Sequence, residues 1–153
     1  FVELRDQGKA RSIGVSNFTP AQIEEITEAT GVRPVVNQIE VHPEFSQAEL
    51  RAWHDEHGIV TESYSPLGPD TDLLSNPGIA QVAEALGRTP AQVVLRWHIQ
   101  LGAIPIPKSA DPVRLRQNLD VFSFELDAGQ MAVLDAVNCD NRTGGDPETN
   151  VEL

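Results

Sequence analysis

A repeated alternation of apolar runs and helix-start signals is the feature that most restricts the fold of this chain. Four short apolar runs have the length and composition of buried parallel strands, at residues 12–16, 35–41, 59–63 and 103–106. Helix-start signals follow or separate them, at Thr19-Pro20, Ser46–Glu49, Asn76-Pro77, Thr89-Pro90 and Asp111-Pro112. Strands that alternate with helices form parallel units, so the sequence predicts an α/β fold with four strand–helix units and one extra helix before the fourth strand.

Helix-stop signals and a polar tail complete this outline. Residues 1–8 are typical of the last turns of a helix that stops at Gly8, and Gly87 and Gly102 occupy similar stop positions. Residues 127–137 carry apolar side chains at helical spacing, whereas residues 140–153 are polar and contain Gly and Pro. We therefore expect a body over residues 1–139 and a C-terminal loop or tail over residues 140–153. Four units could form a small open sheet or half of an eight-stranded barrel.

The charge balance and the cysteine content restrict the partners and the compartment. The chain of 153 residues has 23 acidic against 11 basic side chains and a net charge of −12, which disfavours nucleic acid and anionic membranes as partners. No apolar stretch approaches the roughly 18 residues of a spanning helix, and no secretory signal opens the sequence. A single cysteine, Cys139, excludes an internal disulfide and suits a reducing compartment. We expect a cytoplasmic protein.

A local group of cations stands out against this acidic background. Lys108 and Ser109 end the fourth apolar run, and Arg114 follows the helix start at Asp111. Basic side chains, a hydroxyl and a helix N-terminus at one place favour an anion such as phosphate. The alternative is that these cations pair with nearby acids on the surface.

The other strand ends carry amides, hydroxyls and an aromatic ring. Ser16-Asn17, Asn37-Gln38 and Tyr64 come at the ends of the first three runs. Each has a structural alternative: a turn at Ser16-Asn17, an amide that binds loop backbone, or a core aromatic. Taken together, amides and hydroxyls suit a carboxamide, a flat ring suits stacking, and the cations suit phosphate. The set predicts a nucleotide cofactor with a flat polar head.

Histidines offer a weaker metal hypothesis. His54 and His57 lie three residues apart on a predicted helix, beside acidic residues, and are expected to be solvated. No further ligand accompanies them, so no metal site is predicted. His98 lies inside an apolar helix and is expected to be packed or capped.

Several motifs together resemble one known family. They are Gly14–Phe18, Asn37–Pro43, Tyr64–Gly68, Arg96–His98, Ile106–Ser109 and Arg114 with Asn118. In order and spacing they are similar to the C-terminal half of an aldo-keto reductase along almost the whole chain. The tail at 141–148 is similar to the bacterial 2,5-diketo-gluconate reductase-like branch. The resemblance implies strands five to eight of a (β/α)8 TIM barrel that binds NADPH without a Rossmann domain.

The resemblance also implies which residues contact each part of NADPH. They lie at the strand ends and in the segments that follow. Ser16, Asn17 and Gln38 would hold the nicotinamide carboxamide; Tyr64 would stack on the nicotinamide ring; Ser65, Leu67 and Gly68 would border the pyrophosphate; Lys108, Ser109 and Arg114 would hold the 2′-phosphate; Gln117 and Asn118 would meet the adenine. Two cations and a hydroxyl at one point also favour NADPH over NADH.

The chain departs from the family in its catalytic residues. Aldo-keto reductases use an Asp, a Tyr, a Lys and a His, with the Tyr donating a proton to the carbonyl oxygen. The only tyrosine here is Tyr64, which is assigned to stacking, so no catalytic residue is named. We expect the cofactor-binding half of an NADPH-dependent oxidoreductase that reduces aldehydes or ketones to alcohols, inactive by itself.

The same motifs and the family resemblance also indicate partners and alternative functions. The expected partners are a small carbonyl substrate and the N-terminal half of the barrel, or a second copy that pairs through open sheet edges. One alternative is a non-catalytic NADPH-binding or regulatory protein of the same fold, and another is a self-associating half-barrel. A phosphate-binding lyase or isomerase barrel would share the anion site but would not explain Tyr64 together with Ser16, Asn17 and Gln38.

Overall fold

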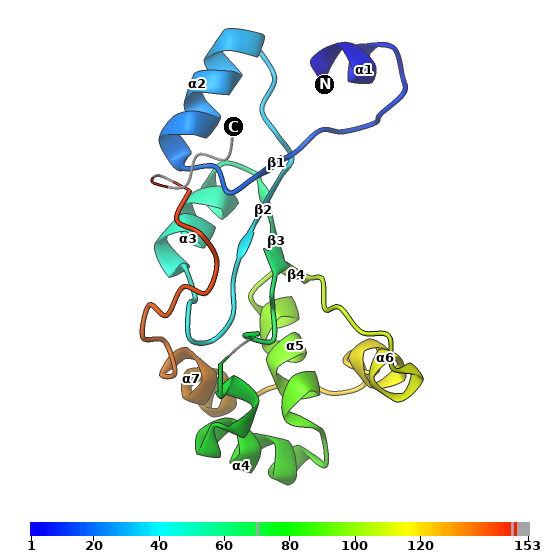
Figure 1. Cartoon of the computed structure of the whole chain (residues 1–153), viewed down its shortest axis with the longest axis vertical. Helices are drawn as coiled ribbons and strands as arrows, with labels where there is room; N and C mark the ends of the chain where they lie inside the picture. Colours follow the sequence, from blue (N-terminus) through cyan, green and yellow to red (C-terminus); the bar gives the residue numbers. More distant parts are fainter. Residues whose placement is uncertain (70, 148, 150–153) are drawn as a thin grey trace.

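Four parallel strands in chain order form the sheet at the centre of the molecule (Figure 1). The computed structural model describes residues 1–69, 71–147 and 149. The strands are β1 (Val15–Ser16), β2 (Val36–Glu40), β3 (Val60–Tyr64) and β4 (Ile104–Pro105), and each pairs in parallel with the next. This arrangement confirms the predicted α/β class. The outer strands β1 and β4 are shorter than predicted; in β4, Pro105 has no N–H to give to a ladder.

Helices connect the strands as the sequence predicts. They are α1 (Val2–Asp6), α2 (Pro20–Thr30), α3 (Ala48–Glu56), α4 (Pro77–Leu86), α5 (Pro90–Gln100), α6 (Pro112–Leu119) and α7 (Ala128–Asp135), with a 3-10 turn η1 (Leu73–Ser75) that was not predicted. The extra helix before the fourth strand is confirmed, since both α4 and α5 lie between β3 and β4. Helix α1 stands apart from the other helices in Figure 1 and buries no residue. No helix in the described part of the chain is long and apolar enough to span a bilayer.

Most predicted helix signals act as expected. Thr19 and Thr89 form reciprocal capping boxes with the glutamine three residues later, and Asn76 and Asp111 cap α4 and α6 with their side chains. The predicted stops Gly8, Gly87 and Gly102 all have positive φ, at 71°, 62° and 76°.

The capping box predicted at Ser46 is wrong. The N-cap of α3 is Gln47, which has a φ of 45° and makes no side-chain cap. The Ser46 N–H donates to Asn138 Oδ1 at 2.9 Å, and the Gln47 amide donates to the Glu40 carbonyl. Contacts with a segment far along the chain therefore displace the local capping pattern at this helix start.

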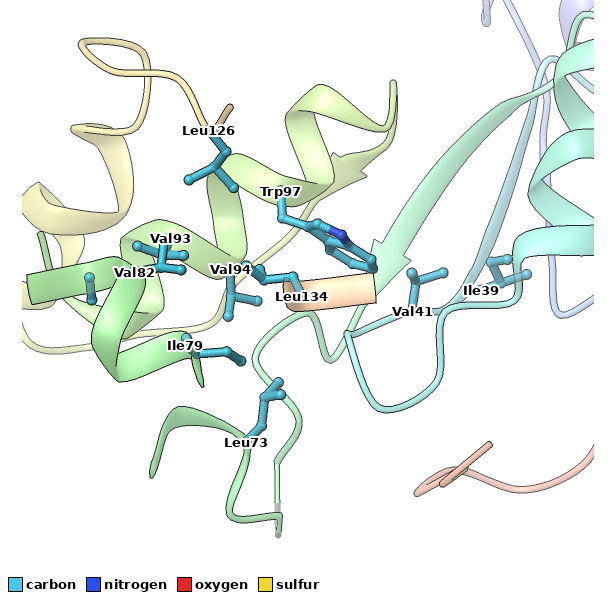
Figure 2. Close-up of a cluster of buried hydrophobic side chains, with 11 residues drawn as sticks. Ile39, Val41, Leu73, Ile79, Val82, Val93, Val94, Trp97, Leu126 and Leu134 are labelled. Atoms are coloured by element: carbon cyan, nitrogen blue, oxygen red, sulfur yellow. The ribbon is translucent and has the colours of Figure 1, made fainter. Parts of the chain in front are cut away.

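The hydrophobic core lies between the sheet end and helices α4, α5 and α7 (Figure 2). Trp97 of α5 is fully buried and belongs to the same cluster as Ile39, Val41 and Leu134. Its indole N–H donates to Asp135 Oδ1 at 2.8 Å, so burial leaves no unpaired donor on the ring. This packing holds α5 against α7 and fixes the body on which the strand ends sit.

Alternation along the strands separates two faces of the sheet. Ile39 packs into the helical core, so Gln38 and Glu40, one residue to either side, point to the opposite face. The register pairs Gln38 with Glu62 and Glu40 with Tyr64. Polar side chains of neighbouring strands are thus placed together on the face away from the core.

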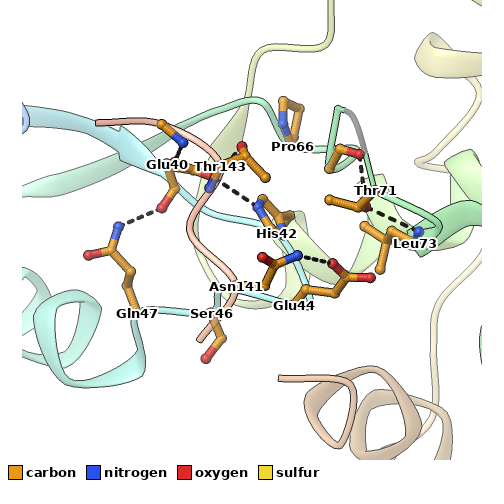
Figure 3. A network of polar contacts seen from close by, with 12 residues as sticks. Glu40, His42, Glu44, Ser46, Gln47, Pro66, Thr71, Leu73, Asn141 and Thr143 are labelled. Carbon is orange, nitrogen blue, oxygen red and sulfur yellow. Dashed lines mark hydrogen bonds and ion pairs between the residues drawn. The ribbon is translucent and has the colours of Figure 1, made fainter. Parts of the chain in front are cut away.

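The predicted tail is partly described. Residues 140–147 form neither helix nor strand, and they run beside the segment between β2 and α3 (Figure 3). Residues 148 and 150–153, including the last position of the tail motif at 141–148, lie outside the described residues.

Candidate functional site

The ends of β1 and β2 are tied together through one carbonyl. Ser16 Oγ donates to the Gln38 carbonyl at 3.0 Å, and the Asn17 N–H donates to the same oxygen at 2.9 Å. Asn17 has a φ of 58°, a conformation that asparagine tolerates better than most residues. The structure therefore brings Ser16, Asn17 and Gln38 together, as predicted.

Asn37 serves the backbone of the loop after β1, which was one of the alternatives for the amide pair. Its Oδ1 accepts from the Phe18 N–H at 3.3 Å and its Nδ2 donates to the Phe18 carbonyl at 2.8 Å. Nδ2 also lies 3.1 Å from His54 Nε2, and His54 Nδ1 lies 3.0 Å from Thr61 Oγ1. An amide NH2 can only donate, so the ring accepts through Nε2 and carries its proton on Nδ1.

The prediction of a solvated His54 is therefore wrong. The side chain is fully buried, and burial lowers the pKa of His54 to about 4. Acidic neighbours in the sequence suggested a surface position, but they lie on other faces of α3. His98 is packed as predicted: it is fully buried, its Nε2 lies 3.1 Å from the Pro66 carbonyl, and burial lowers its pKa to about 3.

Tyr64 lies half-buried at the end of β3, beside the loop after β1. Burial and the nearby Glu40 carboxylate raise the pKa of the Tyr64 hydroxyl, against the opposing effect of a hydrogen bond with the Asn17 side chain and the charge of Arg142. Gln38 Nε2 donates to Glu62 Oε1 at 2.5 Å, which fixes the Gln38 amide on the same face of the sheet. Amide, phenol and carboxylate groups thus line one face at the strand ends.

The loop after Tyr64 is tightly folded. Ser65 has a φ of 50° and Gly68 a φ of 60°, and the Gly68 N–H donates to the Ser65 carbonyl at 3.0 Å. A Cβ at Gly68 would lie 2.7 Å from Thr71 Oγ1, so this position requires glycine for space as well as for φ. Leu67 turns its side chain onto the hydrophobic core. Backbone of this kind, held in sparsely populated conformations, is typical of binding loops.

The cation group lies at the start of α6. Arg114 Nε approaches Ser109 Oγ at 3.5 Å, and Lys108 is exposed. The Asp111 carboxylate already accepts from the Val113 and Arg114 N–H groups, at 2.8 and 2.9 Å. The expectation that the N-terminal amides of this helix bind an anion is therefore wrong for Val113 and Arg114, whose N–H groups are already bonded to Asp111. An anion at this segment would instead be bound by side chains.

The last two predicted residues lie half-buried on α6. Gln117 and Asn118 are partly buried, whereas residues 112–116 and 119 of the same helix are exposed. Asn118 also lines an apolar groove of about 530 Å³ between α5, β4 and α6, together with Leu115 and Leu119.

Two carboxylates of the site were missed from the sequence. Glu40 and Glu62 share the face of Gln38 and Tyr64, and the tail lies against Glu40. The period of two along β2 and β3 was a signal for both carboxylates. The position of the tail had no local signal, because it depends on contacts about 100 residues apart in the chain.

Comparison with known proteins places the chain in a family. The sequence model of the Aldo/keto reductase family matches residues 1–139. The chain belongs to the aldo/keto reductase family. It is 51% identical to 2,5-diketo-D-gluconic acid reductase B of Corynebacterium sp. (strain SHS752001), over 99% of this chain and 55% of that protein. It is 43% identical to methylglyoxal reductase DkgA of Yersinia pestis, over 96% of this chain and 53% of that protein.

Solved structures agree with this assignment. A Gox0644 mutant in complex with NADPH is 53% identical and has a TM-score of 0.94, over 97% of this chain and 55% of that one. MGS-M4, an aldo-keto reductase from a deep-sea metagenome library, is 34% identical and has a TM-score of 0.95, over 98% of this chain and 56% of that one. The chain spans about half the length of the relatives it matches.

Proposed function

We propose that this chain is the cofactor-binding half of an NADPH-dependent oxidoreductase that reduces aldehydes or ketones to alcohols. The observation that carries the proposal is the meeting of Ser16, Asn17, Gln38 and Tyr64 on the carboxyl ends of three adjacent strands. Ligands of parallel α/β folds bind at this end of the strands. The NADPH complex of a neighbour with 53% identity supports the same cofactor for this chain.

The carboxamide end of the cofactor fits the amides at β1 and β2. One amide hydrogen of Gln38 is held by Glu62, which orients the Gln38 oxygen as the acceptor for a carboxamide N–H. Ser16 and Asn17 are fixed on the Gln38 carbonyl and supply a hydroxyl and a second amide. Tyr64, anchored at its hydroxyl by Asn17, would offer the face of its ring for stacking on nicotinamide.

The phosphate end fits the segment after β4. Ser109 and Arg114 already lie within 3.5 Å of each other, and the exposed Lys108 is next in sequence to Ser109. A guanidinium, an ammonium and a hydroxyl suit a dianionic 2′-phosphate better than a neutral ribose hydroxyl. We assign Ser65, Leu67 and Gly68 to the pyrophosphate, and Gln117 and Asn118 to the adenine, by the family resemblance.

The chemistry of the chain itself is to bind and orient. When bound, NADPH supplies the hydride that reduces the carbonyl carbon. The residues of this chain would hold the nicotinamide flat and leave one face towards the substrate. No proton donor is assigned, because the single tyrosine, Tyr64, is committed to the cofactor and its hydroxyl to Asn17.

We propose that strands β1 to β4 are the fifth to eighth strands of a (β/α)8 barrel. Support comes from the parallel order β1-β2-β3-β4, from the two open edges, and from TM-scores above 0.9 over half of longer relatives. Ile104 and Ile106 beside the β4 edge are 51% and 41% exposed, which is unusual for a central sheet. The N-terminal half of the barrel would cover them, and a second copy is the alternative. We propose that residues 1–139 form the body of this half-barrel and that residues 140–153 form its C-terminal tail.

A binding experiment with the intact protein tests the proposal. Titration with NADPH, followed by fluorescence or calorimetry, should show saturable binding that Tyr64→Ser weakens about tenfold, the loss of roughly 1.4 kcal/mol of stacking. Tyr64→Phe is the matched control, because it keeps the ring and loses only the hydroxyl. Methylglyoxal and 2,5-diketo-D-gluconate, the compounds named in two relatives, are suitable first substrates for NADPH oxidation.

The result separates the proposal from its rivals. Saturable NADPH binding with carbonyl-dependent oxidation supports the reductase, whereas binding without turnover of either carbonyl would support a regulatory protein of the same fold. Absence of NADPH binding would contradict both. Turnover by the isolated chain 1–153 would refute the statement that its residues only bind and orient.

A further inference from the structure

The described part of the tail runs beside the segment between β2 and α3 (Figure 3). The N–H groups of Cys139 and Asn141 both donate to the Glu44 carbonyl at 3.1 Å. Asn141 Nδ2 donates to Glu44 Oε2 at 2.8 Å, and Arg142 lies 4.6 Å from the ring centre of Phe45. These contacts bring the next tail residues to the strand ends.

The tail contacts end on a buried carboxylate. Glu40 is fully buried, and its Oε1 accepts from the Thr143 N–H at 2.7 Å and from the Thr143 hydroxyl at 2.6 Å. Its Oε2 accepts from the Gly144 N–H at 2.7 Å. His42 Nε2 lies 3.0 Å from Oε1. Three of these four contacts come from the tail.

Gly144 is pressed between this carboxylate and the phenol of Tyr64. A Cβ on Gly144 would lie 2.8 Å from Glu40 Oε2 and 3.0 Å from the Tyr64 hydroxyl oxygen. Any side chain there would push the tail away from both groups. The tail backbone therefore touches the hydroxyl edge of the residue that the proposed function assigns to nicotinamide stacking.

We propose that Glu40 is a positioning residue that fixes Thr143 and Gly144 over the hydroxyl edge of Tyr64 and so shapes the mouth in which a carbonyl substrate meets the cofactor. This inference rests on the proposed function for its consequence in catalysis. The anchoring itself stands on the contacts of Glu40 alone.

Because Glu40 is buried, its carboxylate is well compensated only while the tail lies against it. A carboxylate removed from water is costly unless charge-assisted hydrogen bonds compensate it. If the tail left, Glu40 would lose the Thr143 and Gly144 donors and keep only His42 among the contacts described here. Burial raises the pKa of Glu40, but its hydrogen bonds with Thr143, Gly144 and His42 outweigh burial and hold the pKa below its usual value. The ionised form thus favours the closed tail.

Amide hydrogen exchange in the intact protein tests the anchor without any ligand. Glu40→Gln keeps one acceptor oxygen but turns an NH2 group towards one of the two tail amides, so the Thr143 or Gly144 amide should exchange about tenfold faster. Gly144→Ala is the second variant, because it leaves Glu40 intact and displaces the tail by contact alone. Glu125→Gln is the matched control, since Glu125 is 82% exposed and pairs only with Arg96 among the described ion pairs.

Steady-state kinetics test the consequence. Both tail variants should raise KM for methylglyoxal about fivefold or more, with kcat and the NADPH dissociation constant changed by less than about threefold. A general loss of folding would instead lower the apparent kcat through the fraction of folded enzyme and leave KM and the NADPH dissociation constant of the folded molecules unchanged, and the Glu125→Gln control should match the wild type. Unchanged exchange at Thr143 and Gly144 in Glu40→Gln would overturn the anchor. Faster exchange with unchanged KM would overturn its role in shaping the mouth.

The two proposals fail in different ways. Failure of the wild-type protein to bind NADPH would refute the proposed function, while the exchange result would still report on the anchor. Normal NADPH binding, with no effect of either tail variant on exchange, would refute the anchor and leave the proposed function standing.

Discussion

Asn37 holds Phe18 by both of its backbone hydrogen-bonding groups, accepting from the N–H at 3.3 Å and donating to the carbonyl at 2.8 Å. Phe18 directly follows Asn17, whose positive φ and contact with Tyr64 depend on where this loop sits. Asn37, which is buried, thereby determines the geometry of its neighbours on the face that we propose to bind the cofactor. His54, bonded to Asn37 and Thr61, extends the support into α3 and β3.

Asn37→Ala should weaken NADPH binding as well as folding. It leaves two backbone groups of Phe18 and one nitrogen of His54 without their partner, which we expect to lower the free energy of unfolding by about 2–3 kcal/mol. The loosened loop should raise the NADPH dissociation constant about tenfold. Urea denaturation and calorimetric titration measure the two effects.

Asn76→Ala provides the control for this prediction. It removes the side-chain cap of α4 and should cost about 1 kcal/mol of stability. Because α4 lies on the core side, NADPH affinity should stay at the wild-type value. Equal loss of affinity in both variants would show that Asn37 acts through stability alone.

Arg114→Ala should reduce discrimination between NADPH and NADH. Removal of a guanidinium that lies 3.5 Å from Ser109 should weaken NADPH binding about tenfold and leave NADH binding nearly unchanged. Arg116→Ala is the matched control on the same helix. Similar affinities of the wild-type protein for both cofactors would contradict the assignment of this segment to a 2′-phosphate.

Buried histidines should make the fold sensitive to acid. Burial lowers the pKa of His54 to about 4 and of His98 to about 3, whereas both are near 6.5 when unfolded. Below pH 6.5 the unfolded state therefore binds more protons, and the free energy of unfolding should fall by up to about 1.4 kcal/mol per pH unit for each histidine.

Urea denaturation at a series of pH values from about 7 to 5 measures this slope, in the range where both histidines titrate in the unfolded state. His54→Asn and His98→Asn should each flatten it, even if each also lowers stability at pH 7. Curves that stay parallel to the wild type would contradict a neutral buried histidine at that position.

The isolated chain 1–153 should self-associate through its open sheet edges. Ile104 in the edge strand β4 is 51% exposed, and Leu119 and Phe122 nearby are 75% and 72% exposed. Ile104→Lys should shift the sedimentation profile towards monomer, because a charge on an edge strand opposes pairing. Leu74→Lys, on an exposed leucine of η1, is the control. A compact monomer for the unmodified chain would refute edge pairing.

Much of the fold could be read from local patterns. Thr19, Thr89, Asn76 and Asp111 cap the helices they were predicted to cap, because each bond joins residues two or three apart. Apolar runs between these caps placed the four strands within a few residues. Ser46 failed as a cap, since its N–H is taken by Asn138, 92 residues away.

The candidate site likewise has features that local sequence patterns predict and features that depend on long-range contacts. By itself the sequence determined which residue types stand at the strand ends, from Ser16 to Arg114, because strand order and helix caps depend on neighbours in the chain. Only the tertiary structure decided that His54 is buried, that Glu62 orients Gln38, and that Gly144 rests between Glu40 and Tyr64. Those contacts join segments up to 104 residues apart, and no local pattern encodes the burial and pairing that make them favourable.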